Sequence, residues 1–229
     1  MLKAQKKLSK KEMKEDRLVT SYFQATSWYE QNKKLVSSVA TGVILVVVVA
    51  VVVFNNLRSN NEKATSELGK VMRLYDERRF DLAINGNPQE NVRGLQAVVD
   101  DYGSTKAGEL ATFYLANAYY GQGNYDKALE YFQEVDVEDP MLASSALAGA
   151  AASYEAKADH ANAADYFERA AYKDPRGVLA AEHMMHAAQN YTNAGQKEKA
   201  VDLYKRLKRE YPTSPYVREI DRYIAEASS

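Results

Sequence analysis

Two apolar patterns follow one another along the chain. Between Lys34 and Arg58 lies an uncharged stretch of 23 residues, whose core VSSVATGVILVVVVAVVVF is almost continuously apolar. Beyond it, apolar residues return at three- and four-residue steps, as they do on one face of an amphipathic helix. Together the patterns predict one long apolar helix followed by an all-α domain.

Within that domain, a skeleton of small, aromatic and proline residues recurs three times, at offsets of 35 and 37 residues. Its landmarks are Ala116, Tyr119, Gly123, Ala128, Phe132 and Pro140 in the first copy; Ala151, Tyr154, Ala158, Ala163, Phe167 and Pro175 in the second; and Ala188, Tyr191, Gly195, Ala200, Tyr204 and Pro212 in the third. Self-similarity at this period predicts a stack of helical hairpins, an architecture that presents extended binding surfaces.

The residue types in this skeleton suit the packing of antiparallel helices. Ala116 and Ala128 are expected to meet where the two helices of the first hairpin approach most closely, and the other copies repeat the pair. Gly123 with Asn124, Ala158 with Asp159, and Gly195 are expected in the turns between the helices of the three hairpins. Pro140 and its equivalents are expected at the end of each second helix, where proline blocks continuation.

The first copy, LANAYYGQGNYDKALEYFQEVDVEDP, resembles the tetratricopeptide repeat. We therefore expect an all-α fold with an N-terminal transmembrane helix and a tetratricopeptide-repeat α-solenoid. The expected parts are a basic amphipathic tail (1–34), a transmembrane anchor (35–57) and a repeat domain (58–229) made of one degenerate hairpin (58–108), three repeats (109–142, 144–178 and 181–214) and a C-terminal capping helix (214–227).

The flanks of the repeats carry helical patterns of their own. Residues 64–79 are predicted to be helical, FDLAINGNPQEN to form a loop, and a second helix to run from about Val92 to Tyr102, with no strand anywhere. One amphipathic helix from Ser214 to Ala227 is expected to cover the apolar side of the third hairpin.

The apolar stretch is long enough to span a bilayer, because about 20 helical residues cross the hydrocarbon core. A buried strand is an alternative for so valine-rich a run, but strands are usually about four to eight residues long. A cleaved signal peptide is another alternative, but the run is too long and FNNLRSN after it offers no small-x-small cleavage site. We therefore expect an uncleaved anchor.

Charge is distributed unevenly around this anchor. The first 34 residues hold nine Lys and Arg against four Asp and Glu, whereas the rest of the chain holds 21 against 27. The positive-inside rule then predicts a cytoplasmic N-terminus and repeats on the far side of the membrane. The chain has no cysteine, which is compatible with an oxidising compartment and excludes disulfide bonds.

The tail carries a helical stripe formed by Leu18, Tyr22, Ala25 and Tyr29. Two interpretations stay open, and they are not exclusive. The helix can lie at the membrane surface, where its lysines meet anionic lipid. It can also dock on the cytoplasmic side of a membrane partner.

Neither a catalytic nor a cofactor-binding nor a metal site is expected. His183 and His186 are spaced to share a helix face, but the surrounding sequence supplies no third ligand, so they are interpreted as ordinary helix residues. Nucleic acid is not an expected partner, because the part of the chain after the anchor is net acidic.

The first helix of each hairpin is expected to line a concave groove that binds unfolded or extended polypeptide segments. The candidate peptide-binding residues are Leu110, Phe113, Asn117, Tyr120, Glu155, Met185 and Gln189, and the other positions expected to be exposed there are Ser145, Ala148, Ala152, Glu182 and Thr192. Packing between repeats is the alternative role for Phe113 and Met185. A carboxylate clamp for chaperone C-termini is not expected, because Phe113 stands where that clamp needs lysine.

From about Lys11 to its C-terminus the chain is similar to YfgM-type proteins, in the forms found in Bacteroidetes and Chlorobi. The likeness rests on the basic tail, the single anchor, VVDDYGSTKAGELATFYLANAYYGQGNYDKALEYF and KRLKREYPTSPYVREIDRYIAEA. It implies a single-pass protein of the bacterial inner membrane with a periplasmic repeat domain. It also implies an ancillary subunit of the Sec translocon that works with a membrane-anchored, periplasmic prolyl-isomerase-like chaperone on newly translocated proteins.

Two other functions stay open. An adaptor in cell-envelope assembly, for outer-membrane biogenesis or associated with Tol, would share the EYPTSPY-type ending, although the chain has no cysteine for a lipoprotein anchor. An accessory anchor subunit of a membrane enzyme complex is the other alternative, and nothing in the sequence binds a cofactor for it.

The predicted register makes Ala151 a close helix–helix contact. Its replacement by leucine should overpack the second hairpin and lower the free energy of unfolding by about 1–3 kcal/mol. Thermal unfolding of the full chain measures this loss. An unchanged melting temperature would mean that the register is wrong.

Overall fold

The structure is a computed structural model that describes residues 10–228. It divides into two compact units, Met1–Asn56 and Leu57–Ser229. Helix α2 (Lys33–Asp76) runs through the boundary between them. The lysine-rich start of the predicted tail, residues 1–9, lies outside the described residues.

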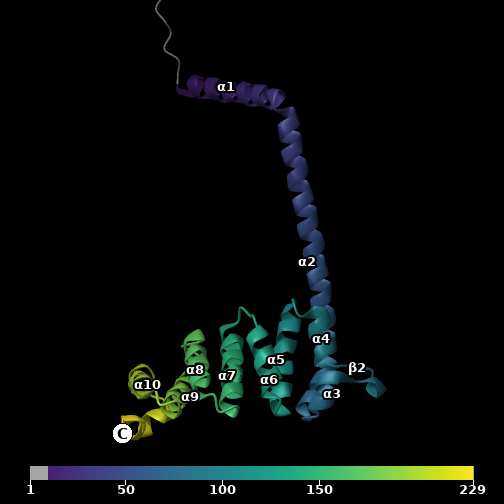
Figure 1. Cartoon of the computed structure of the whole chain (residues 1–229). Coiled ribbons are helices and arrows are strands. Elements are labelled where there is room, and N and C mark those ends of the chain that lie inside the picture. The colour runs from purple at the N-terminus through teal and green to yellow at the C-terminus, as the bar shows by residue number, and fades with distance from the viewer. Residues whose placement is uncertain (1–9, 229) are drawn as a thin grey trace, which may run out of the picture. The chain divides into compact units, whose positions relative to one another are not determined.

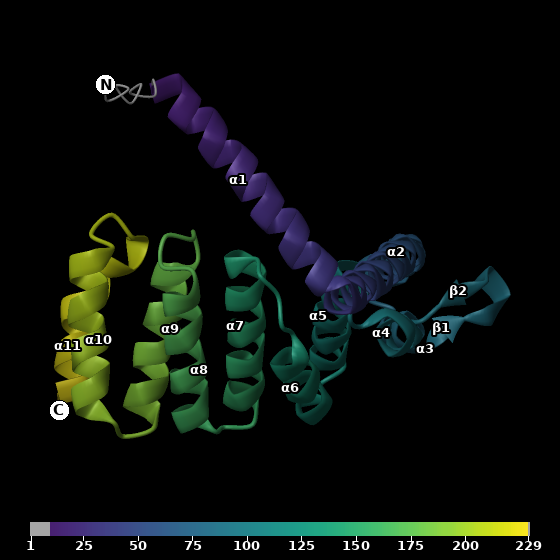
Figure 2. The ribbon, with the colours of Figure 1, turned by 90° about the horizontal axis from the view of Figure 1, so that it is seen from above.

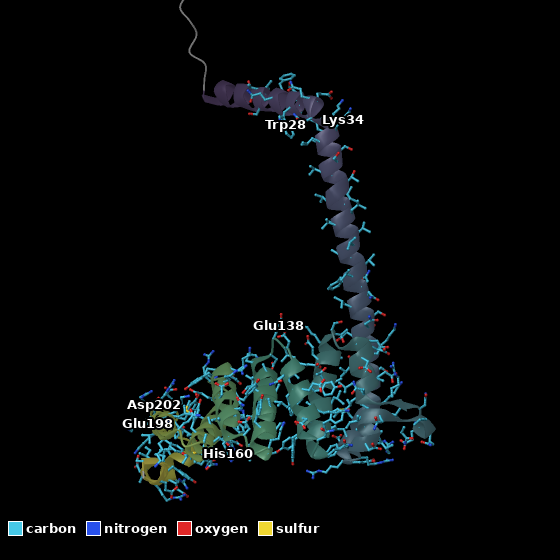
Figure 3. All side chains as sticks on the ribbon, in the orientation of Figure 1. Trp28, Lys34, Glu138, His160, Glu198 and Asp202 are labelled. Carbon is cyan, nitrogen blue, oxygen red and sulfur yellow. The ribbon has the colours of Figure 1, made fainter. Side chains whose placement is uncertain are left out.

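The first unit contains α1 (Lys10–Gln31) and the apolar part of α2. The two helices are separated at Asn32, whose backbone N–H donates to the carbonyls of Trp28 and Tyr29 at 3.0 and 3.1 Å. Trp28 projects from α1 with 56% of its surface exposed (Figure 3). By length and composition α2 is the one described helix able to cross a membrane, and none of the side chains in its apolar window is buried.

The second unit begins with the polar end of α2 and a short irregular region. The region contains α3 (Phe80–Asn85), β1 (Gly86–Asn87), a 3₁₀ helix η1 (Pro88–Glu90), β2 (Val92–Arg93) and α4 (Leu95–Tyr102). The expectation of a loop without strands is wrong here, because its first six residues form α3 and because β1 and β2 pair antiparallel. This pairing holds Val92 and Arg93 extended, so α4 begins at Leu95 rather than at Val92.

Three helical hairpins follow and stand side by side in a row (Figures 1 and 2). They are formed by α5 (Lys106–Gly121) with α6 (Tyr125–Glu134), α7 (Pro140–Ala156) with α8 (His160–Lys173), and α9 (Ala180–Asn193) with α10 (Lys197–Glu210). The paired alanines of the sequence skeleton are fully buried in all three: Ala116 with Ala128, Ala151 with Ala163, and Ala188 with Ala200. The predicted burial of these small residues is confirmed.

The turn inside each hairpin passes through the left-handed region at the same repeat position. Gly123, Ala158 and Gly195 have φ values of 77°, 60° and 73°. In the first two hairpins the next residue caps the second helix, because the side chains of Asn124 and Asp159 accept hydrogen bonds from backbone N–H groups. The prediction that these residues form the turns is confirmed.

The prolines divide into two kinds. Pro175 and Pro212 follow α8 and α10, as predicted. Pro140 does not end α6, which stops at Glu134; it begins α7. Proline suits this position because its missing N–H would have no partner in the first helical turn.

The C-terminal cap is not one helix. A 3₁₀ helix η2 (Pro215–Glu219) precedes α11 (Ile220–Ser228). Ser214 favours the tighter 3₁₀ winding at the start of this segment. Its hydroxyl accepts a hydrogen bond from the N–H of Tyr216, and its carbonyl accepts one from the N–H of Val217. Ile220 is fully buried against the third hairpin, so the cap still covers apolar surface.

The core of the second unit consists of two hydrophobic clusters that adjoin on α7. Ala150 belongs to the cluster that extends back to α2, and its neighbour Ala151 to the cluster that extends forward to α11. At the beginning of the first cluster, the side-chain oxygen of Asn61 on α2 accepts from the backbone N–H of Ala107 at 2.9 Å and so helps to cap α5.

The left-handed turn predicts opposite effects for two substitutions. Ala158→Gly should raise the free energy of unfolding by about 0.5–1 kcal/mol, because glycine has no Cβ to strain at positive φ. Gly123→Ala should lower it by about 1 kcal/mol. A Cβ at Gly123 would meet no atom within 4 Å, so the backbone alone would cause the loss.

Denaturant unfolding of the full chain measures both effects, and each variant is the control for the other. A lower stability for Ala158→Gly would contradict the turn geometry.

Candidate functional site: a strip along the first helices

The repeat register places four positions of each first helix on a common face. We call this face the first-helix strip. Its residues are Leu110, Phe113, Asn117 and Tyr120 on α5; Ser145, Ala148, Ala152 and Glu155 on α7; and Glu182, Met185, Gln189 and Thr192 on α9.

The α5 part of the strip is aromatic and partly exposed. Tyr120 has 37% of its surface exposed and its ring lies 5.4 Å from that of Tyr125. Phe113 is half-buried with its ring 6.0 Å from that of Phe132, so it both packs within the repeat and keeps an exposed part. Asn117 donates its side-chain amide to the carbonyl of Phe113 at 2.8 Å.

Leu110 is also half-buried against the first core cluster. The α7 positions Ser145, Ala148 and Ala152 are half-buried as well and are small, so backbone and Cβ atoms form much of the surface there. A small-residue face of this kind allows another chain to approach closely.

Met185 does not belong to the accessible part of the strip. Only 4% of its surface is exposed, and it lies in the second core cluster, against which Tyr216 and Val217 of η2 pack. The expectation that Met185 is exposed is therefore wrong, and the alternative role stated for it, packing in the core, is what the structure shows. On the same helix Gln189 and Thr192 remain half-buried.

A buried polar bridge joins the second and third hairpins beneath the strip. Asn190 on α9 has no exposed surface, and its amide donates to the Glu155 carboxylate at 2.9 Å. The amide oxygen of Asn190 lies 2.9 Å from Nδ1 of His160, the first residue of α8. The bridge fixes Glu155 at the strip, and sequence reasoning missed it because the three residues come from three helices.

The strip carries negative charge on its α7 and α9 parts. Burial raises the pKa of the Tyr120 phenol, and the neighbouring Tyr125 and Glu155 add to the rise. Burial likewise raises the pKa of Tyr216, with a further contribution from Glu182. A bound segment would therefore meet aromatic surface on α5 and carboxylates on α7 and α9.

The two histidines of α9 stack on one aromatic ring. The rings of His183 and His186 lie 6.4 and 5.1 Å from that of Phe167. His183 is buried, and its Nε2 has no hydrogen-bond partner among the described residues. Within residues 10–228 no group of three or more His, Asp or Glu side chains is placed to hold a metal ion.

Comparison with known families identifies the repeats. Models of the tetratricopeptide repeat match residues 110–135 and 184–214, which fall in the first and third hairpins. The second hairpin, α7 with α8, has the same form between them. No curated protein matches the chain.

Two solved structures resemble the chain in fold. Both are crystal structures of nearly identical TPR-like repeats assigned to a kinesin light chain of Podosopora anserina, and one of them carries a glutamine-to-methionine substitution. Each is 18% identical to this chain and covers 75% of it; the TM-scores are 0.52 and 0.51, over 84% and 85% of the respective structures. The chain has an all-α tetratricopeptide-repeat fold, which is typically a noncatalytic scaffold for binding other proteins.

The unpartnered His183 predicts a pH-dependent stability. Burial lowers its pKa, and the nearby His186 contributes in the same direction, whereas Glu182 opposes the change. The folded state disfavours protonated His183. The contribution of neutral His183 to the free energy of unfolding is therefore fully present above the pKa of the unfolded state, about 6.5, and is lost as the pH falls below that value. Each tenfold weakening of proton affinity at His183 on folding corresponds to about 1.4 kcal/mol in the free energy of unfolding.

His183→Leu should therefore lose less stability than the parent chain between about pH 7.5 and 5.5. Thermal unfolding at both pH values measures this, and His186→Leu is the matched control on the same helix. If the stability of the parent chain and that of His183→Leu depended equally on pH, the loss of stability at low pH would not come from His183.

Proposed function

We propose that the protein is a membrane-tethered scaffold that holds unfolded or extended segments of other polypeptides along the first-helix strip. The observation that carries this proposal is the stack of three tetratricopeptide hairpins, whose first helices share a face of aromatic, small and acidic residues. Such faces bind peptide segments through side-chain pockets and shape. Because this surface mixes aromatic, small and acidic residues, we expect it to bind segments of many different sequences.

The tether in this proposal is the apolar part of α2. The apolar side chains from Val39 to Phe54 are exposed, and a bilayer would remove them from water. The excess of Lys and Arg before this segment supports a cytoplasmic N-terminus with the repeats on the far side of the membrane. The similarity to YfgM-type proteins supports the bacterial inner membrane as the location and the periplasm as the compartment of the repeats. The exposed aromatic residues of α1 suit a headgroup layer, and the neighbouring lysines suit anionic lipid.

The proposed partners are subunits of the Sec translocon and a membrane-anchored, periplasmic prolyl-isomerase-like chaperone. The similarity to YfgM-type proteins supports them. A tether beside the translocon would raise the effective concentration of the strip near emerging chains, so modest affinity for each segment would suffice.

Photo-crosslinking in cells tests the strip and the partners together. Benzoylphenylalanine in place of Tyr120 should crosslink to other polypeptides several-fold more than the same probe in place of Lys205. Lys205 is the control because it is exposed on a second helix, α10, outside the strip. Mass spectrometry of the products identifies the partners.

Translocon subunits and newly translocated proteins among the Tyr120 products would support the proposal. Equal crosslinking from both positions would contradict binding at the strip. Products drawn instead from outer-membrane assembly or from a redox complex would contradict the assignment to the translocon.

A further inference from the structure

A cleft of about 690 Å³ opens between the second helices of the first and second hairpins. It lies between α6 and α8, at the loop that leads from α6 to α7, and therefore apart from the first-helix strip. Its lining includes Phe132, Asp136, Leu147, Tyr166, Arg169 and Lys173. Its volume is typical of clefts that bind small ligands or short peptide segments.

The cleft exists because α6 is short. Helix α6 has 10 residues, whereas α8 and α10 have 14 each. The 35-residue offset makes Glu134, the last residue of α6, equivalent to Arg169, so the final turn that α8 forms with residues 170–173 has no counterpart in α6. Four of residues 135–139 are valines or aspartates, which have low helix propensity, and Val135 is already extended at ψ 106°.

The floor and the walls of the cleft differ in chemistry. Phe132 and Leu147 give it an apolar floor. On the α8 wall, Arg169 lies over the Tyr166 ring at 4.4 Å and approaches Asp165 only to 3.7 Å. Lys173 on the same wall is exposed, and among residues 10–228 no carboxylate lies within ion-pair distance of it.

The next cleft along the stack has the opposite charge. Between α8 and α10 the lining contains four carboxylates, from Asp165, Glu168, Glu198 and Asp202, and one lysine (Figure 3 labels Glu198 and Asp202). One of these carboxylates, that of Glu168, accepts a hydrogen bond from the Tyr191 hydroxyl at 2.7 Å. An anionic segment is therefore complementary to the cleft beside α6 and is repelled by the cleft beside α10.

We propose that the cleft between α6 and α8 binds a segment of a partner polypeptide in which a large apolar side chain is followed by an acidic one. The apolar side chain fills the space left by the missing turn and contacts Phe132 and Leu147. The carboxylate pairs with Lys173 and Arg169. Asp136 on the opposite wall accepts a backbone N–H of the segment and disfavours a second carboxylate there.

Fluorescence anisotropy tests this with the full chain in nanodiscs of zwitterionic phosphatidylcholine. The probe is the C-amidated peptide Gly-Ser-Phe-Glu-Leu-Ser-Gly, labelled on its N-terminal amine with a dye that has no carboxylate, so that the glutamate supplies its only carboxylate. Saturable binding is expected. Replacing the peptide's glutamate by glutamine, or Lys173 by glutamate, should weaken it by about tenfold, as loss of a charge-assisted hydrogen bond predicts.

Charge reversal supplies the decisive control. A peptide with lysine in place of glutamate should bind the Lys173→Glu variant better than it binds the parent chain. Lys205→Glu, a matched change of an exposed lysine on α10, should leave binding of the acidic peptide unchanged. Any binding at the first-helix strip would be the same in both lysine variants, so a difference between them reports on the cleft alone.

Absence of saturable binding to the parent chain would overturn the proposal. Equal binding of the glutamate and glutamine peptides, or equal losses with Lys173→Glu and Lys205→Glu, would overturn it as well. Lys173 is exposed in the last turn of α8, so Lys173→Glu should lower the free energy of unfolding by no more than about 1 kcal/mol, and thermal unfolding measured alongside shows that the variant is folded.

Discussion

The fold depends on one constraint repeated three times, the complete burial of two alanines at equivalent positions in each hairpin. Ala116 and Ala128, like their equivalents in the other hairpins, have no exposed surface. Because the paired side chains are small, the helices pack closely, and aromatic residues fill the space between successive hairpins. The close packing of the helices fixes the stack of hairpins, and the stack positions both the first-helix strip and the cleft between α6 and α8.

Local patterns in the sequence are enough to predict that stack. The alanine pairs and the turns at Gly123, Ala158 and Gly195 depend on residues close to one another in the chain, so a fixed period reveals them. Burial that depends on distant segments is not predictable in this way. The repeat pattern predicts an exposed Met185, but this residue is buried in the second core cluster, which gathers residues from α7 to α11. The bridge through Asn190 joins three helices and has no local signal.

The main departure from regular repeat geometry, the early end of α6, opens the cleft between α6 and α8. The repeat pattern predicts that Pro140 ends α6, whereas this proline begins α7 and the five residues before it are not helical. Their composition, with valines and acidic residues leading to a proline, is a local signal of the early helix end. The short α6 leaves a cleft with a basic wall on one side of the stack, while the first-helix strip combines aromatic and acidic residues on the first helices. One solenoid thus carries two surfaces with different chemistry.

The most direct test of the scaffold account is a native purification of the full chain in mild detergent, with mass spectrometry of every protein retained, beside a chain that lacks residues 1–34. The account predicts recovery of Sec translocon subunits and a periplasmic chaperone, in smaller amounts when the tail is absent. Recovery of outer-membrane assembly or redox-complex components without translocon subunits would contradict it.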